Sequence, residues 1–208
     1  VKAALTALGY DPDKLEILLL QMVNLLRGGE VVKMSKRTGK SITLAELIEE
    51  VGADAARYFF IMRSLDSQLD FDIDLAKSHS NENPVYYIQY AYARIHSIYR
   101  QAEENQIAYG AWENTDFSLL TEPAELDLIK QMSEYREMIA NAAAAHAPHR
   151  LARYLYELAG LFHSFYKQCR ILGIDQERQQ ARLGLITATK YILWHGLTIL
   201  GVRAPEKM

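Results

Sequence analysis

Residues 148–173 read PHRLARYLYELAGLFHSFYKQCRILG, and this stretch decides the fold class. Its apolar residues alternate spacings of four and three, which places them on one face of a helix over residues 151–172. Pro148 marks a fresh helix start, and Gly173 ends the pattern. An amphipathic helix of this kind is typical of a helix bundle. The face consists of Leu151, Leu155, Leu158, Phe162, Phe165, Cys169 and Leu172.

Three further helices are expected around this one. Asn83 and Pro84 form an N-cap and a first-turn proline for a helix that runs to about residue 104. A second helix is predicted over residues 123–145 and a third over residues 177–200. Residues 105–122 are expected to be a connecting loop. Together the helices predict an all-α bundle over the later part of the chain.

The earlier part of the chain has a mixed pattern. The apolar run at residues 17–26 predicts a buried strand, and the strict alternation at residues 69–74 predicts an edge strand. Thr43 and Glu46 match a capping box at the start of a helix. Asp54 is expected to cap the next helix.

Composition limits the class of protein. Half of the 208 residues are apolar and 24% are charged, as in a soluble, mostly helical chain. No apolar run is expected to span a bilayer. The single cysteine, Cys169, excludes an internal disulfide or a cysteine zinc cluster and fits a reducing cytoplasm. The net charge of −3 means that any RNA-binding surface must concentrate positive charge locally. Because Val1 falls within an amphipathic stretch, we expect a piece of a longer protein.

Residues 33–40 form a polar loop with four cations in eight positions: Lys33, Lys36, Arg37 and Lys40. Such a loop repels itself unless an anion binds. Taken alone, the pattern favours a solvated basic loop.

The first residues of this loop resemble the Lys-Met-Ser-Lys-Ser signature of class I aminoacyl-tRNA synthetases, with arginine in place of the last serine. Residues 52–58 resemble the Asp-Ala-Leu-Arg stretch that follows the signature, with Ala56 where leucine is usual. The resemblance implies that the loop binds ATP, with Mg²⁺ expected beside it and no protein-bound metal. It also implies that Lys33 and Lys36 are catalytic and stabilise charge on the phosphates. The implied ATP-binding residues are Lys33, Met34, Ser35, Lys36 and Arg37.

Residues 69–76, 83–94 and 200–208 are similar to arginyl-tRNA synthetases in particular. The similarity implies a mainly α chain, in which residues 1–80 end a Rossmann-type catalytic domain and residues 81–208 form an all-α anticodon-binding bundle. The implied partners are arginine, ATP and arginine tRNA, and we expect a cytoplasmic monomer with no membrane contact. Since the His-Ile-Gly-His-type signature is absent, these residues alone are not expected to aminoacylate. A non-catalytic RNA-binding module and another class I synthetase, such as the cysteine or methionine enzyme, remain alternatives.

Candidate tRNA-binding residues lie away from the apolar faces. On the helix from Pro84, the side chains of Tyr87, Tyr90 and Arg94 fall outside the expected core face, and rings beside a guanidinium suit unstacked bases. Tyr166 and Arg170 lie off the apolar face of the later helix, and the resemblance places Tyr166 and Met208 near the anticodon loop. The alternative is that each tyrosine packs with its hydroxyl at the surface.

In the intact ligase that the resemblance implies, we predict that Lys36→Ala slows adenylate formation by about 10²–10³-fold. The ammonium would stabilise charge that grows on phosphate oxygens during attack on the α-phosphate, so ATP affinity should change much less. Single-turnover measurement of arginyl-adenylate formation, beside ATP binding, tests the assignment. An activation rate close to that of the unmodified enzyme would contradict it.

Overall fold

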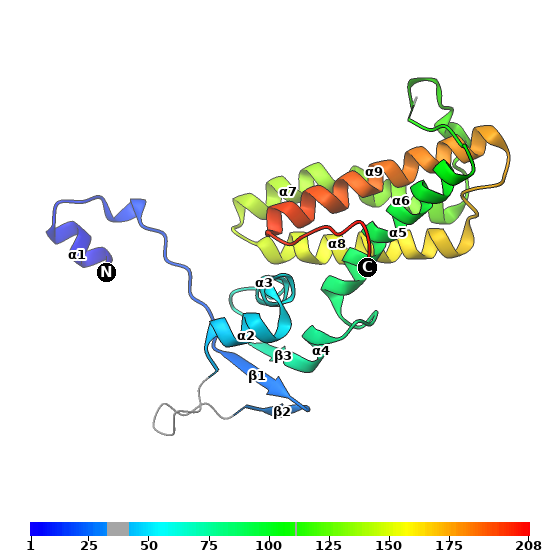
Figure 1. Ribbon diagram of the computed structural model, residues 1–208. Coiled ribbons are helices and arrows are strands. Elements are labelled where there is room, and N and C mark those ends of the chain that lie inside the picture. Colours follow the sequence, from blue (N-terminus) through cyan, green and yellow to red (C-terminus); the bar gives the residue numbers. More distant parts are fainter. Residues whose placement is uncertain (33–41, 111) are drawn as a thin grey trace.

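The computed structural model describes residues 1–32, 42–110 and 112–208. It consists of a helix bundle and a small three-stranded sheet, so the predicted mainly α fold class is confirmed (Figure 1). The basic loop, including Lys33, Lys36 and Arg37, lies outside the described residues. The expected division between residues 80 and 81 stays a prediction.

The bundle is organised around one central helix. Its elements are α5 (Pro84–Glu104), α6 (Pro123–Ser133), α7 (Tyr135–Ala144), α8 (Pro148–Gln168) and α9 (Gln176–Leu200). Helix α8 contacts each of the other four, and the predicted apolar face is buried from Leu151 to Cys169. The predicted N-cap of α5 is confirmed, since Asn83 Oδ1 accepts hydrogen bonds from the backbone N–H groups of Val85 and Tyr86.

Two helix boundaries differ from the sequence prediction. The single helix expected over residues 123–145 is broken at Glu134, which ends α6 and precedes α7. The Ser133 hydroxyl donates to the carbonyl of Lys130 at 2.7 Å, a local bond that competes with helical continuation. Helix α8 ends at Gln168, four residues before Leu172, because Cys169 adopts an extended conformation. The Arg182 side chain binds the next carbonyl, that of Arg170, at 2.6 Å.

The connection expected over residues 105–122 contains two short 3-10 helices, η2 (Trp112–Asn114) and η3 (Phe117–Leu119). The Phe117 ring lies so close to α9 that a Cβ at Gly184 would be 2.5 Å from it. Glycine at this position therefore lets the connection pack directly on the helix.

The sheet precedes the bundle and has the strand order β2-β1-β3. The strands of the sheet are β1 (Val23–Arg27), β2 (Glu30–Val31) and β3 (Leu69–Asp72). The helices that accompany them are α2 (Leu44–Val51), α3 (Ala53–Ile61) and α4 (Ile73–Lys77). Strand β1 is antiparallel to β2 and parallel to β3, with α2 and α3 in the crossover between the parallel strands. This βαβ unit is the repeating unit of Rossmann-type sheets.

Within the sheet unit, the predicted capping box of α2 is confirmed: Glu46 N donates to Thr43 Oγ1, and Thr43 N donates to the Glu46 carboxylate. The alternation of β3 is also confirmed, with Phe71 fully buried and Asp70 exposed. The predicted strand ends at Asp72, however, whose carboxylate caps α4 by accepting from Leu75 N at 2.9 Å.

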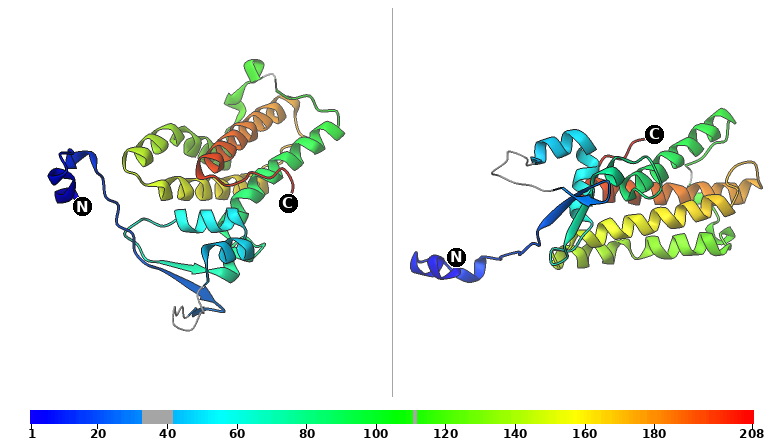
Figure 2. Two further views of the ribbon diagram at one scale, coloured as in Figure 1. Left: turned by 60° about the vertical axis from the view of Figure 1, so that its left-hand side comes forward. Right: turned by 90° about the horizontal axis from the view of Figure 1, so that it is seen from below.

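The prediction of a buried strand over residues 17–26 is wrong for its first part. Only Val23 onward forms β1, and Ile17, Leu19 and Met22 are exposed. Among the described residues, β1 finds strand partners only in β2 and β3, and neither extends alongside residues 17–22. The preceding helix α1 (Lys2–Ala7) and the 3-10 helix η1 (Pro12–Lys14) stand apart from the rest of the molecule (Figures 1 and 2).

Helix α3 joins the sheet to the bundle. The buried Tyr58 hydroxyl donates to the carbonyl of Ala152 in α8 at 2.9 Å, and burial raises the pKa of Tyr58 well above its ordinary value. Asp54 does not cap α3 as expected; the N-cap is Gly52, whose φ of +83° suits glycine. The Asp54 carboxylate instead accepts hydrogen bonds from the backbone and the guanidinium of Arg203.

A buried ion pair holds the far end of the bundle. Arg182 Nε lies 2.6 Å from Glu125 Oε1, with the two side chains 7% and 0% exposed. Because Arg182 also binds the Arg170 carbonyl, one guanidinium links α6, α9 and the turn after α8. The Glu125 carboxylate further accepts from the backbone N–H of Glu122 at the start of α6.

Helix α9 corrects the expectation that no segment is apolar enough to span a bilayer. By length and composition alone it is long and apolar enough to cross a membrane, with a mean hydropathy of 1.2 over its most apolar stretch of 18 residues. Half of that stretch is buried inside the protein, as in a core helix of a bundle.

We predict that Gly196→Ala destabilises the fold by about 1–3 kcal/mol, because overpacking a core forces its side chains to shift. A Cβ at this position in α9 would lie 2.5 Å from Cδ2 of the fully buried Leu155. Gly160→Ala in α8 is the matched control, since its Cβ would lie 3.7 Å from the Tyr87 hydroxyl oxygen. That change should stabilise by up to about 1 kcal/mol. Denaturant unfolding should show opposite signs, and equal effects would contradict the packing.

We predict that Arg182→Met lowers the free energy of unfolding by about 3–5 kcal/mol, because it leaves the Glu125 carboxylate buried without its counter-charge. Adding Glu125→Gln, which removes that charge but keeps an acceptor for Glu122 N, should recover part of the loss. Urea denaturation of both single variants and the double variant gives the coupling energy. Strictly additive losses would show that the two groups do not act as a pair.

Candidate functional site

The outer side of α5 carries a row of stacked rings that continues onto a neighbouring segment. The rings of His79 and Tyr86 have centroids 5.6 Å apart, and those of Tyr86 and Tyr90 are 5.9 Å apart, each pair at 13°. Tyr86 and Tyr90 are one helical turn apart, which is why their rings meet. His79 follows α4 and is placed by Asn83, whose side chain donates to the carbonyls of Ala76 and Ser78.

Arg94 extends this row from α5 to α8. Its Nη2 donates to the Tyr90 hydroxyl at 2.6 Å. Its guanidinium carbon lies 4.4 Å from the centroid of the Tyr90 ring and 4.7 Å from that of Tyr166. The predicted residues Tyr90, Arg94 and Tyr166 are therefore brought together. We refer to His79, Tyr86, Tyr90, Arg94 and Tyr166 as the aromatic row.

Tyr87 lies beside the aromatic row but packs between helices. Its ring centroid is 4.5 Å from that of His163 and 5.2 Å from that of Tyr156, both on α8. Burial, with a smaller effect from Tyr156, raises the pKa of Tyr87. Its ring therefore packs against α8 and supports the α5–α8 contact.

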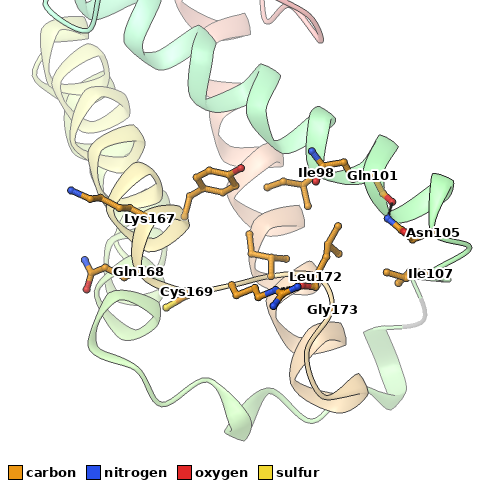
Figure 3. Close-up of a pocket in the computed structure, with 12 residues that line it drawn as sticks. Ile98, Gln101, Asn105, Ile107, Lys167, Gln168, Cys169, Leu172 and Gly173 are labelled. Atoms are coloured by element: carbon orange, nitrogen blue, oxygen red, sulfur yellow. Dashed lines mark hydrogen bonds between the residues drawn. The ribbon is translucent and has the colours of Figure 1, made fainter.

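One end of the row opens on a cavity of about 760 Å³ between α5 and the end of α8 (Figure 3). Tyr166 belongs to both the row and this cavity. Arg170, also predicted as a contact residue, lies on the turn that closes it, where its Nε donates to the Leu172 carbonyl at 3.0 Å. The polar lining also includes Gln101, Asn105, Lys167 and Gln168.

The other end of the row opens on a second cavity, of about 600 Å³, lined by His79, Tyr86 and Met208 among others. The segment that leads to Met208 is held on α5. Gln89 Nε2 donates to the Arg203 carbonyl at 2.9 Å, and Arg100 Nη1 donates to the Glu206 carbonyl at 3.3 Å.

The row and its two cavities thus bring together five of the six predicted tRNA-binding residues, and the sixth, Tyr87, packs behind them. Sequence reasoning missed His79 and Tyr86. The four-residue spacing of Tyr86 and Tyr90 was a signal for the second of these. His79 had no such signal, because its position depends on how the segment before α5 folds back.

The remaining predicted site lies outside the described residues. These residues, Lys33, Met34, Ser35, Lys36 and Arg37, come after the end of β2 in sequence with one residue between, and their assignment stays a prediction. In residues 1–32, 42–110 and 112–208, no three His, Cys, Asp or Glu side chains gather in a way that could hold a metal ion.

Comparisons with known proteins identify the family to which the bundle belongs. The DALR anticodon binding domain family matches residues 88–208. The chain is 58% identical over its full 208 residues to the arginine–tRNA ligase of Carboxydothermus hydrogenoformans, and 56% identical over 209 aligned residues to that of Desulforudis audaxviator. It spans 37% of the length of each of these proteins.

Solved structures give the same result. All of the chain superimposes on 44% of an arginyl-tRNA synthetase from Campylobacter jejuni, with a TM-score of 0.84 and 31% identity. It also superimposes on 38% of the Thermus thermophilus arginyl-tRNA synthetase, with a TM-score of 0.74 and 27% identity. Because the family match covers residues 88–208, more than half of the chain, and the structure is a helix bundle over that range, the chain belongs to the DALR anticodon-binding domain family.

Proposed function

We propose that the bundle binds the anticodon loop of arginine tRNA, as part of a ligase that activates arginine with ATP and transfers it to that tRNA. The observation that carries the proposal is the aromatic row, which joins two cavities along one face of α5 and α8. The choice of arginine is supported by the arginine–tRNA ligases described above, whose alignments cover the whole length of this chain.

The aromatic row has the chemistry that a single-stranded loop needs. Unstacked bases gain about 1–3 kcal/mol each by stacking on aromatic side chains, and a guanidinium can stack or meet a phosphate. Tyr166 is 39% exposed, and Tyr86 and Tyr90 are partly exposed, so their rings are accessible while held in place by neighbours. A loop bound here needs little reorganisation of the protein.

The two cavities supply positions at which individual bases could be recognised. Each has the volume of a small-molecule site, and each lies next to a ring of the row. In the larger one, the amides of Gln101 and Asn105 offer donors and acceptors for a base edge, while Lys167 and Arg170 offer positive charge. This local charge meets the requirement set by an acidic chain with a net charge of −3.

The catalytic part of the proposal rests mainly on residues 33–37. Lys33 and Lys36 would act on ATP, with Mg²⁺ bound through the nucleotide's phosphates. They fall in sequence between the parallel strands β1 and β3, whose βαβ unit is the kind that builds a nucleotide-binding sheet. Within the proposal, the intact ligase is a cytoplasmic monomer. The 208 residues taken alone are proposed to bind tRNA without charging it.

We predict that Tyr90→Ala and Tyr166→Ala each weaken binding of an arginine anticodon stem-loop RNA by about 1–3 kcal/mol, because each removes a stacking ring. Tyr166→Phe keeps the ring and should retain most of the affinity. Tyr191→Ala is the matched control, an exposed tyrosine on α9 outside the row. Fluorescence anisotropy at fixed salt gives the affinities.

Specificity is tested with the same RNA carrying a changed anticodon, which should bind more weakly than the arginine stem-loop. Equal affinity for the two RNAs would contradict anticodon recognition. Equal losses from Tyr166→Phe and Tyr166→Ala would contradict stacking, because the two variants differ in the presence of the ring.

A further inference from the structure

His163 lies beneath the aromatic row, between the backbone of α5 and the side chain of Arg94. Its Nε2 is 3.2 Å from the carbonyl oxygen of Tyr87, and its Nδ1 is 3.4 Å from Arg94 Nη1. The imidazole is half-buried, and its ring also meets those of Tyr87 and Tyr90. It therefore connects α8 to both the backbone and the guanidinium of α5.

These two partners require one protonation state of the ring. A backbone carbonyl only accepts hydrogen bonds, so Nε2 must carry a proton. A guanidinium only donates, so Nδ1 must be free of one. The neutral tautomer with hydrogen on Nε2 satisfies both partners at once, whereas the imidazolium would point an N–H at a cation.

The electrostatic surroundings agree with a neutral ring. Burial is the largest cause and lowers the pKa of His163, and the Arg94 charge lowers it further, against an opposing effect of the Tyr87 carbonyl. At neutral pH the ring is thus a neutral acceptor for Arg94.

We propose that His163 is a positioning residue for RNA binding, whose bare Nδ1 fixes the Arg94 guanidinium beside the rings of Tyr90 and Tyr166. The proposal rests on the proposed function of the aromatic row. The guanidinium has five N–H donors, and bonds to His163 and the Tyr90 hydroxyl occupy two of them. The donors that remain are held in one orientation for the RNA. The conformational entropy of the Arg94 side chain is thus lost when the protein folds, and RNA binding does not have to offset it.

Two conservative substitutions separate positioning from packing. In His163→Asn, the short amide places an oxygen near the position of Nδ1, where it can accept from Arg94. In His163→Gln, the longer amide can reach the Tyr87 carbonyl as a donor but leaves Arg94 without its acceptor. We expect His163→Asn to bind the arginine anticodon stem-loop within about threefold of the unmodified chain, and His163→Gln to bind about tenfold more weakly.

A second measurement does not depend on RNA. Nitrogen-15 NMR of the 208-residue chain should show His163 with a protonated Nε2 and a bare Nδ1. The Arg94 Nε–H signal should report an ordered side chain in the unmodified chain and in His163→Asn, and a mobile one in His163→Gln. His195→Gln is the control for affinity, because His195 bonds to Tyr135 on the α7–α9 side of the bundle, away from the row.

The outcomes distinguish this proposal from the function on which it rests. If the unmodified chain does not bind the stem-loop, the proposed function fails, and the NMR measurements still decide how Arg94 is positioned. If it binds and the Asn and Gln variants behave alike, His163 has no positioning role. A proton on Nδ1, or an Arg94 side chain that is equally ordered in both variants, would overturn the inference directly.

Discussion

The buried guanidinium of Arg182 is the interaction on which the shape of the bundle's far end depends. It neutralises Glu125, which lies at the start of α6, and it takes up the carbonyl of Arg170 just after α8. A charge buried to this degree is stable only with a full set of partners. Three segments distant in sequence therefore meet at one point, directly after the end of α8. The cavity beside Tyr166 and Arg170 exists because the chain turns there and does not continue as helix.

Helix α5 serves both the core of the bundle and the aromatic row. One face of this helix is core, with Ile88 and Ile95 fully buried, and the adjoining face carries the aromatic row. The packing that stabilises the bundle thus also sets the distance between Tyr90 on α5 and Tyr166 on α8. Recognition of an RNA loop needs rings held at defined separations, and a rigid helix pair supplies them without a mobile loop.

How much of this could be predicted from sequence depended on how local each determinant is. The apolar face of α8, the cap at Asn83 and the box at Thr43 and Glu46 are fixed by spacings of three or four residues, and all were predicted. The early end of α8 was not, because the side chain that binds the carbonyl just beyond it, Arg182, lies on another helix. The break at Glu134 was missed because the local bond beside it, from the Ser133 hydroxyl to the Lys130 carbonyl, leaves no mark in the apolar pattern.

The site followed the same rule. The turn spacing on α5 predicted Tyr90 and Arg94 as neighbours. Their contact with Tyr166 and His163 depends on the α5–α8 packing, and the place of His79 depends on the fold of the preceding segment.

Helix α3 fixes how the bundle is oriented relative to the sheet. Tyr58 binds the backbone of α8, and Asp54 binds Arg203 beside α5. Hydrogen bonds are directional, so the two contacts fix both the angle and the distance between α3 and the bundle. A rotation of the bundle would therefore rotate the β-strands together with it.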